Sequence, residues 1–70
     1  MSKTIGSYVK QIDKIIEKLI KELARRGNYE NFGQKEYRKF REEVNADNNL
    51  SCAVQANLCA ELADQIHIIQ

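Results

Sequence analysis

Residues 26–41 read RGNYENFGQKEYRKFR, and this segment separates two stretches of chain with helical periodicity. It contains four of the five aromatic residues and two of the three glycines. A glycine after Arg25 and Arg26 is typical of a helix C-terminus, where glycine adopts the left-handed conformation and cations interact favourably with the helix dipole. Gly27 is therefore predicted to end a first helix.

The second half of the segment carries the signals of a helix start. With Gly33 as the N-cap, Glu36 occupies the third helical position, as in a capping box. Phe32 then faces Tyr37, as in a hydrophobic staple. Asn31 is the alternative N-cap. We expect the large aromatic side chains before this start to cover one end of the core.

Before this segment, residues 5–26 show the clearest periodicity of the chain. Apolar residues recur at intervals of three and four and fall in an arc of roughly 180° on a helical wheel. The apolar positions are Ile5, Tyr8, Val9, Ile12, Ile15, Ile16, Leu19, Ile20, Leu23 and Ala24. Ser2, Thr4 and Ser7 are the candidate N-caps. The pattern predicts an amphipathic helix with one face toward the core.

After the segment, residues 45–49 read NADNN and predict a turn, because Asn and Asp side chains compete with the helical backbone. Asp47, Asn48 or Asn49 is predicted to cap a third helix over about 48–68. This helix is apolar most of the way round, and such a pattern indicates a largely buried helix.

Small side chains share one face of the third helix. They are Cys52, Ala56, Cys59, Ala60 and Ala63. Two interpretations fit this face: close packing inside the monomer, or self-association as a homodimer, which often stabilises small domains. The two cysteines lie about 10 Å apart along the helix, too far for a disulfide between them. We interpret them as reduced thiols in a cytoplasmic protein.

Together these signals predict an all-α fold, a small three-helix bundle that forms a single domain over residues 1–70. The expected helices span about 5–26, 34–44 and 48–68. The chain contains no proline, in keeping with helices throughout. We expect the first and third helices to form an antiparallel pair that the second helix closes.

The net charge of +1 conceals a division of charge along the chain. Residues 1–41 contain all eleven lysines and arginines against five acidic residues, a net charge of +6. Residues 42–70 contain five acidic residues and no lysine or arginine, a net charge of −5. Such a division favours either a charged partner or attraction between the two ends within one bundle.

Basic residues on the predicted outer faces of the first two helices form a candidate contact surface. They are Lys10, Lys14, Lys18, Lys21, Arg25, Arg38, Lys39 and Arg41. This surface would contact the phosphates of a nucleic acid or an acidic protein, or would serve only to keep the helices soluble. Aromatic residues interleave with the basic residues of the segment 26–41, as in proteins that stack single-stranded bases.

Several functions lack support in the sequence. The glycines are isolated, and no serine has a histidine or acid at a recognisable catalytic spacing, so we expect no enzyme activity. A metal site on Cys52, Cys59, Asp64 and His67 would lack any CxxC or HxxxH pair, and no metal or cofactor is expected. Neither a membrane span nor a targeting segment is expected. The prediction is a small non-catalytic interaction or regulatory module with a protein partner, itself or another; the alternative is a nucleic-acid-binding accessory protein.

Overall fold

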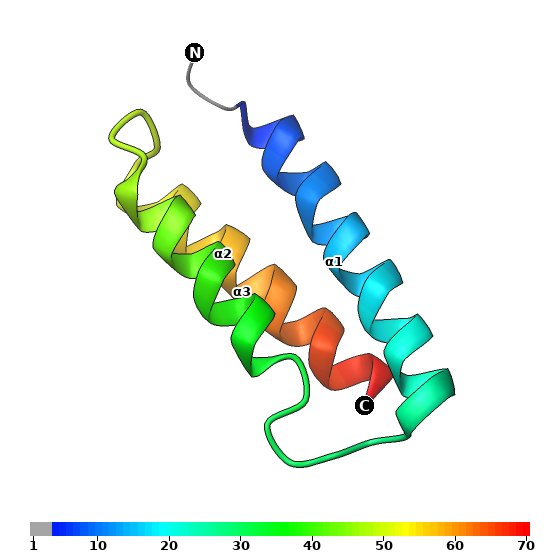
Figure 1. Ribbon diagram of the computed structural model, residues 1–70. Helices are drawn as coiled ribbons and strands as arrows, with labels where there is room; N and C mark the ends of the chain where they lie inside the picture. Colours follow the sequence, from blue (N-terminus) through cyan, green and yellow to red (C-terminus); the bar gives the residue numbers. More distant parts are fainter. Residues whose placement is uncertain (1–3) are drawn as a thin grey trace.

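The computed structural model describes residues 4–70, and this part of the chain forms three α-helices and no strand (Figure 1). The helices are α1 (Ile5–Arg26), α2 (Gln34–Ala46) and α3 (Cys52–Ile69). They pack side by side as a three-helix bundle, which confirms the predicted all-α fold. The bounds of α1 agree with the prediction, α2 extends two residues further, and α3 begins four residues later.

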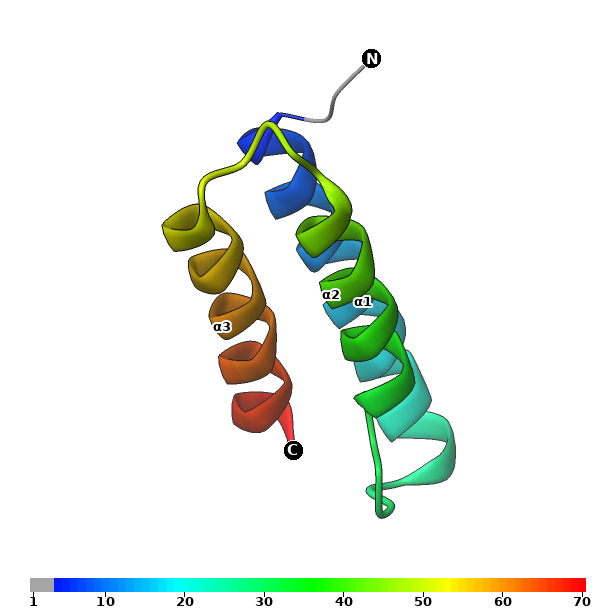
Figure 2. The same cartoon turned by 90° about the vertical axis from the view of Figure 1, so that its left-hand side faces the viewer.

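The direction of the helices differs from the prediction. Two short connections, residues 27–33 and 47–51, each reverse the chain, so α1 and α3 run parallel and α2 runs antiparallel to both (Figures 1 and 2). The predicted antiparallel pair of the first and third helices was therefore wrong. Short connections make sequence neighbours antiparallel, and this leaves the first and third helices with the same direction. α3 packs closely against both other helices.

Both ends of α1 have identifiable caps. Thr4 is the N-cap among the three candidates, since its hydroxyl oxygen accepts a hydrogen bond from the Ser7 N–H at 3.1 Å. Ser2 lies outside the described residues. At the other end, the N–H of Gly27 donates to the carbonyl of Leu23 at 2.8 Å. Gly27 has the predicted positive φ of 78°, but its ψ of −179° gives an extended exit rather than the left-handed helical conformation.

α2 begins after Gly33, which is in the left-handed conformation with φ 74°. The residue is the N-cap, as predicted, but no side chain completes a capping box. Glu36 points across to α1, where its carboxylate lies 3.8 Å from Lys18 Nζ. Phe32 is buried beside the start of the helix, and Tyr29 packs edge-to-face on it with 5.6 Å between ring centroids. The aromatic pair thus covers one end of the core.

The N-cap of α3 is Ser51, whose hydroxyl oxygen accepts a hydrogen bond from the Val54 N–H at 3.2 Å. The prediction that Asp47, Asn48 or Asn49 would cap this helix was wrong. All four residues are of types that make good N-caps, so local preference does not choose among them. One of the three predicted residues makes a contact with α1 instead.

That contact is made by Asp47 at the C-terminal end of α2. Its carboxylate accepts a hydrogen bond from the Tyr8 hydroxyl at 2.7 Å and another from the Asn49 N–H at 2.9 Å. The amide of Gln55 donates to the carbonyls of Asp47 and Val44, both at 3.1 Å. The turn between α2 and α3 is therefore joined to both α1 and α3.

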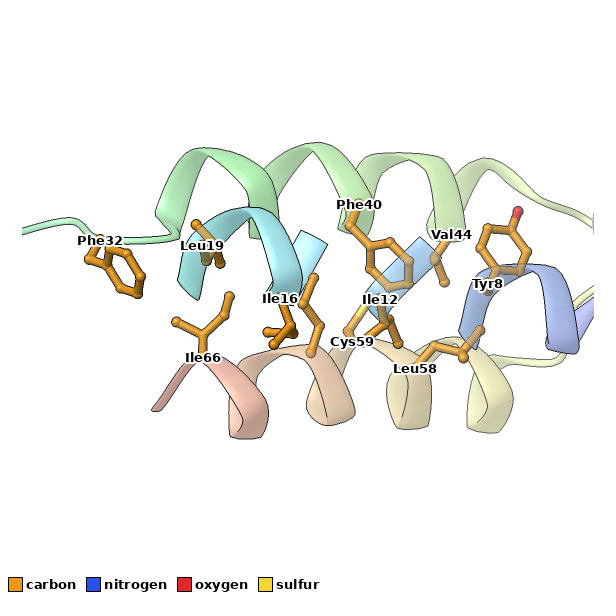
Figure 3. Packing of buried hydrophobic residues seen from close by; sticks show 11 residues of the cluster. Tyr8, Ile12, Ile16, Leu19, Phe32, Phe40, Val44, Leu58, Cys59 and Ile66 are labelled. Atoms are coloured by element: carbon orange, nitrogen blue, oxygen red, sulfur yellow. The ribbon is translucent and has the colours of Figure 1, made fainter. Parts of the chain in front are cut away.

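The core contains side chains from all three helices and from the first connection. Its buried members are Tyr8, Ile12, Ile16, Leu19, Phe32, Phe40, Val44, Leu58, Cys59, Leu62 and Ile66 (Figure 3). Tyr8 and Phe40 meet edge-to-face with ring centroids 6.0 Å apart, an arrangement that aromatic pairs favour. These contacts hold the three helices in one bundle.

α3 is buried on one side only. Leu58, Cys59, Leu62 and Ile66 face the core, whereas the alanines of the helix are exposed. The prediction of a largely buried helix was therefore wrong. Large aliphatic side chains gain more from burial than alanine does, because the gain grows with the apolar area removed from water. The larger residues consequently determine which side of α3 faces inward.

Candidate interaction surfaces

The residues considered for a metal site do not come together. Cys59 lies in the core, while Cys52, Asp64 and His67 are exposed on α3. Within residues 4–70, no group of three or more histidine, cysteine, aspartate or glutamate side chains is placed to hold a metal ion. Over the same residues, no helix is both long enough and apolar enough to cross a membrane.

The exposed side of α3 contains a regular row of small residues. Ala53, Ala56, Ala60, Ala63 and His67 follow one another at intervals of three and four residues, and all five are exposed. We call this row the outer face of α3. The interval is the seven-residue repeat with which helices pair along a seam in coiled coils. No residue of the row is acidic, lysine or arginine.

The predicted association surface needs two changes to match this face. Cys59 belongs to the core, with 8% of its surface exposed, and burial raises the pKa of its thiol although the nearby Arg41 opposes the shift. Ala53 belongs to the outer face but was not predicted there. Its position three residues before Ala56 is the sequence signal that would have included it. Cys52 is exposed and borders the face.

On one side, the outer face is bordered by the basic residues of α2. Arg38 and Arg41 are exposed and line a hollow of about 160 Å³ together with Gln34 and Tyr37. The effect of Arg41 on the Cys59 thiol places Arg41 on the Cys59 side of α3, and Arg38 lines the same hollow as Arg41. We call Arg38 and Arg41 the arginine border.

On the other side, the outer face is bordered by carboxylates of α3 itself. Successive helical residues advance by about 100°, which places Glu61 and Asp64 on the opposite side of the outer face from Cys59. Both are exposed, and Glu61 accepts a hydrogen bond from the amide of Gln65 at 2.8 Å. We call Glu61 and Asp64 the carboxylate border. Ile68 lies at the same edge with 78% of its surface exposed.

The eight predicted basic residues are all exposed, and carboxylates lie between those of α1 and those of α2. The five on α1 are exposed along a single face of that helix. Lys39 shares a hollow of about 210 Å³ with Lys18 from α1, but Glu36 and Glu43 line the same hollow. Lys39 also shares a hollow of about 320 Å³ with Arg38, which Lys35 and Glu42 line as well. Carboxylates thus interrupt the positive charge between α1 and α2.

The aromatic residues of the segment 26–41 are unsuited to base stacking. Phe32 and Phe40 are 4% and 1% exposed, so their ring faces are in the core. Tyr37 is half-buried against the same core, and Tyr29 alone of the four is exposed. Stacking of single-stranded bases needs several accessible ring faces. The interleaving of basic and aromatic residues is therefore explained by packing.

Comparison with known proteins identifies no relative: no protein-family model, no curated protein and no solved structure matches the chain. Inferences about function consequently depend on the surfaces described above.

Proposed function

We propose that the protein is a small non-catalytic interaction module that associates with a second copy of itself through the outer face of α3. One contrast carries this proposal. α1 and α2 present lysine, arginine and glutamate to solvent, together with the exposed Ile5, Val9 and Ile20 of α1, whereas the outer face of α3 exposes four alanines at coiled-coil spacing with no acidic, lysine or arginine side chain among them. Small side chains allow two helix axes to approach at the short end of the usual 8–10 Å range.

Association also suits the size of the bundle. A chain of 70 residues has a core of limited size, and many domains of this size gain stability from a partner. Alanine contributes little area, so the interface belongs among the small ones, below about 1,200 Å² in total, which are typical of weak and transient complexes. We therefore expect dissociation constants in the micromolar range.

Sedimentation equilibrium at protein concentrations from low to high micromolar tests the proposal. The wild-type protein should shift from monomer to dimer over this range. Ala60→Glu places a charge at the centre of the outer face and should keep the protein monomeric, with unchanged helix content. Ala24→Glu makes the same change at an exposed alanine of α1 and should leave association intact. A wild-type protein that stays monomeric into the high micromolar range would contradict the proposal.

A cytoplasmic location is part of the same proposal. Cys52 is an exposed free thiol next to the association face. Exposed thiols persist in a reducing compartment, whereas an oxidising one would convert them to disulfides. Fractionation of cells that express the tagged protein would test this location.

Nucleic-acid binding is the second candidate, and the exposed cations along α1 favour it. They are Lys10, Lys14, Lys18, Lys21 and Arg25. Phosphate contacts strengthen as salt is lowered, because counterions are released when the protein binds. A salt titration with short DNA and RNA duplexes and single strands should therefore show binding at low salt. Absence of binding there would exclude this candidate.

A further inference from the structure

The contacts between α2 and α3 show which residues of the two helices lie at the same height. The β-carbon that Gly33 lacks would lie 3.0 Å from Ile66 Cγ2. Eleven residues further along α2, the carbonyl of Val44 accepts a hydrogen bond from Gln55 Nε2 at 3.1 Å. From the first contact to the second, the residue number on the α2 side rises by eleven and the residue number on α3 falls by eleven. One step along α2 therefore corresponds to one step back along α3.

The same relation gives the residue of α3 that lies level with each member of the arginine border. Arg38 lies level with residue 61, and Arg41 lies level with residue 58, beside Cys59, whose thiol it influences. Glu61 therefore lies at the height of Arg38. Asp64 lies about three residues further along α3, a distance of roughly 4.5 Å along the axis. The arginine and carboxylate borders thus occupy the same section of the bundle, on opposite sides of the outer face.

Two symmetric arrangements are open to a pair of copies that meet through this face. In a parallel pair the two-fold axis runs along the helices, so the left border of one copy meets the right border of the other. In an antiparallel pair the axis is perpendicular to the helices, so each border meets its own counterpart. These relations follow from two-fold symmetry alone.

Charge decides between the two arrangements. A parallel pair brings arginines against carboxylates on both sides of the seam, with Arg38 level with Glu61 and the two borders offset by about 4.5 Å along the axis. An antiparallel pair brings arginines against arginines and carboxylates against carboxylates. Like charges placed opposite one another across an interface oppose association, whereas complementary charges favour it and fix the register. Within residues 4–70 of one copy, neither Arg38 nor Arg41 has an ion pair, so both are available to a partner.

We propose that the protein forms a parallel homodimer in which the outer faces of α3 meet. Arg38 and Arg41 of each copy then pair with the partner's Glu61 and the partner's Asp64. The inference rests on the self-association proposed above and adds the direction of the two chains and the residues that determine it.

Crosslinking of single cysteines shows whether the two copies are parallel or antiparallel, and this readout does not depend on the charges of the borders. In a Cys52→Ala background, Ala53→Cys and Ala63→Cys each place one thiol on the outer face. A parallel dimer brings both of these positions next to their counterparts. In any antiparallel register at least one of them is separated from its counterpart by about 15 Å or more along the axis, at 1.5 Å per residue. A bismaleimide that spans less than about 10 Å, two helical turns, distinguishes these cases.

In a parallel dimer both variants should crosslink. Dimers by sedimentation in which one or neither variant crosslinks would overturn the parallel arrangement and leave the proposed function standing. A monomer at every concentration would contradict both. The Cys52→Ala parent is the control, because its remaining thiol, Cys59, is buried and should not crosslink.

Charge reversal tests the pairing itself. Arg38→Glu with Arg41→Glu makes all borders of a parallel dimer acidic and should weaken association by about ten-fold, from the loss of several exposed pairs. Adding Glu61→Arg and Asp64→Arg restores opposite charges and should restore association. An antiparallel dimer would respond differently, because each of its borders meets its own counterpart before and after reversal. No weakening in the first variant would therefore refute the pairing. Circular dichroism checks that the variants, all at exposed positions, keep their helix content.

Discussion

Gly33 lies where side chains of α1 and α3 meet the start of α2, and its replacement by alanine should be among the most damaging single-methyl changes in the bundle. Gly33 is the buried N-cap of α2, with φ 74°. An added β-carbon would lie 3.0 Å from Cγ2 and 3.2 Å from Cδ1 of Ile66 on α3. It would also lie 3.3 Å from Cδ1 of Leu19 on α1. The methyl group would therefore press on both neighbouring helices at once.

Two costs contribute to the expected loss of stability. A residue with a β-carbon in the left-handed conformation costs roughly 1–2 kcal/mol. Insertion of a methyl group into a packed core costs typically about 1–3 kcal/mol more. Gly33→Ala should thus lower the free energy of unfolding by about 2–5 kcal/mol. Domains of this length are stable by only about 4–10 kcal/mol, so the loss is a large share of the total.

Urea unfolding followed by far-ultraviolet circular dichroism, at one low protein concentration, gives the necessary values. The decisive quantity is the coupling between Gly33→Ala and Ile66→Val, which removes Cδ1, one of the two Ile66 atoms that the new methyl would meet. If the added methyl group is crowded by Ile66, Ile66→Val should lower the free energy of unfolding by less in the Gly33→Ala variant than in the wild type. Double-mutant cycles detect such coupling between residues in contact.

Gly27→Ala is the matched control. Gly27 also has a positive φ, 78°, but no heavy atom lies within 4 Å of the position of its β-carbon. It should show a backbone penalty of about 1–3 kcal/mol and no coupling with Ile66→Val. A cost below about 0.5 kcal/mol for Gly33→Ala, or additivity with Ile66→Val, would refute the reasoning.

Three further predictions concern the core, a cap and a buried hydroxyl group. Leu62→Ala, at a side chain with no exposed surface, should lower the free energy of unfolding by about 2–5 kcal/mol in the same urea assay. Ser51→Ala removes the hydroxyl that caps α3 and should cost about 0.5–2 kcal/mol; Ser51→Thr, which keeps a capping hydroxyl, should recover most of the loss. Burial, followed by the hydrogen bond to Asp47 and the charges of Asp47 and Glu43, raises the pKa of Tyr8 from 10.0 to about 12. Because the fold favours the neutral phenol, this contribution to stability is complete below pH 10 and is lost as the pH rises toward 12. Tyr8→Phe should remove that part of the pH dependence in urea unfolding above pH 10, and an unchanged slope would contradict the assignment.

The course of α1 and the position of the first connection could be predicted from the sequence because their signals are local and strong. Large apolar residues at helical spacing fix the face of α1, and Gly27 and Gly33 have the positive φ that glycine adopts most readily. The start of α3 could not be predicted in this way. Its N-cap is Ser51, while Asp47 accepts a hydrogen bond from Tyr8, which lies 39 residues earlier in the chain. Such a contact exists only after the bundle has formed.

The outer face of α3 was only partly predictable for a different reason. A count of apolar residues treats alanine and cysteine like leucine, so α3 reads as apolar nearly all round. In the bundle the burial follows side-chain size: Leu58 and Leu62 turn inward, and Ala60 between them turns outward. Cys52 and Cys59 have the same size and differ in burial because Cys59 lies on the side of α3 that its large aliphatic residues turn inward. Size at each helical position is the information that the apolar pattern omits.

The difference in burial between the two cysteines also provides a way to measure how often the bundle opens. Cys52 is exposed and reacts in the folded state, whereas the Cys59 thiol is shielded among core side chains near α2 and has a raised pKa. A thiol reagent can modify Cys59 only when α2 and α3 move apart. The rate at which Cys59 is labelled, relative to Cys52, therefore reports how often the native bundle opens at equilibrium, without denaturant and without an introduced cysteine.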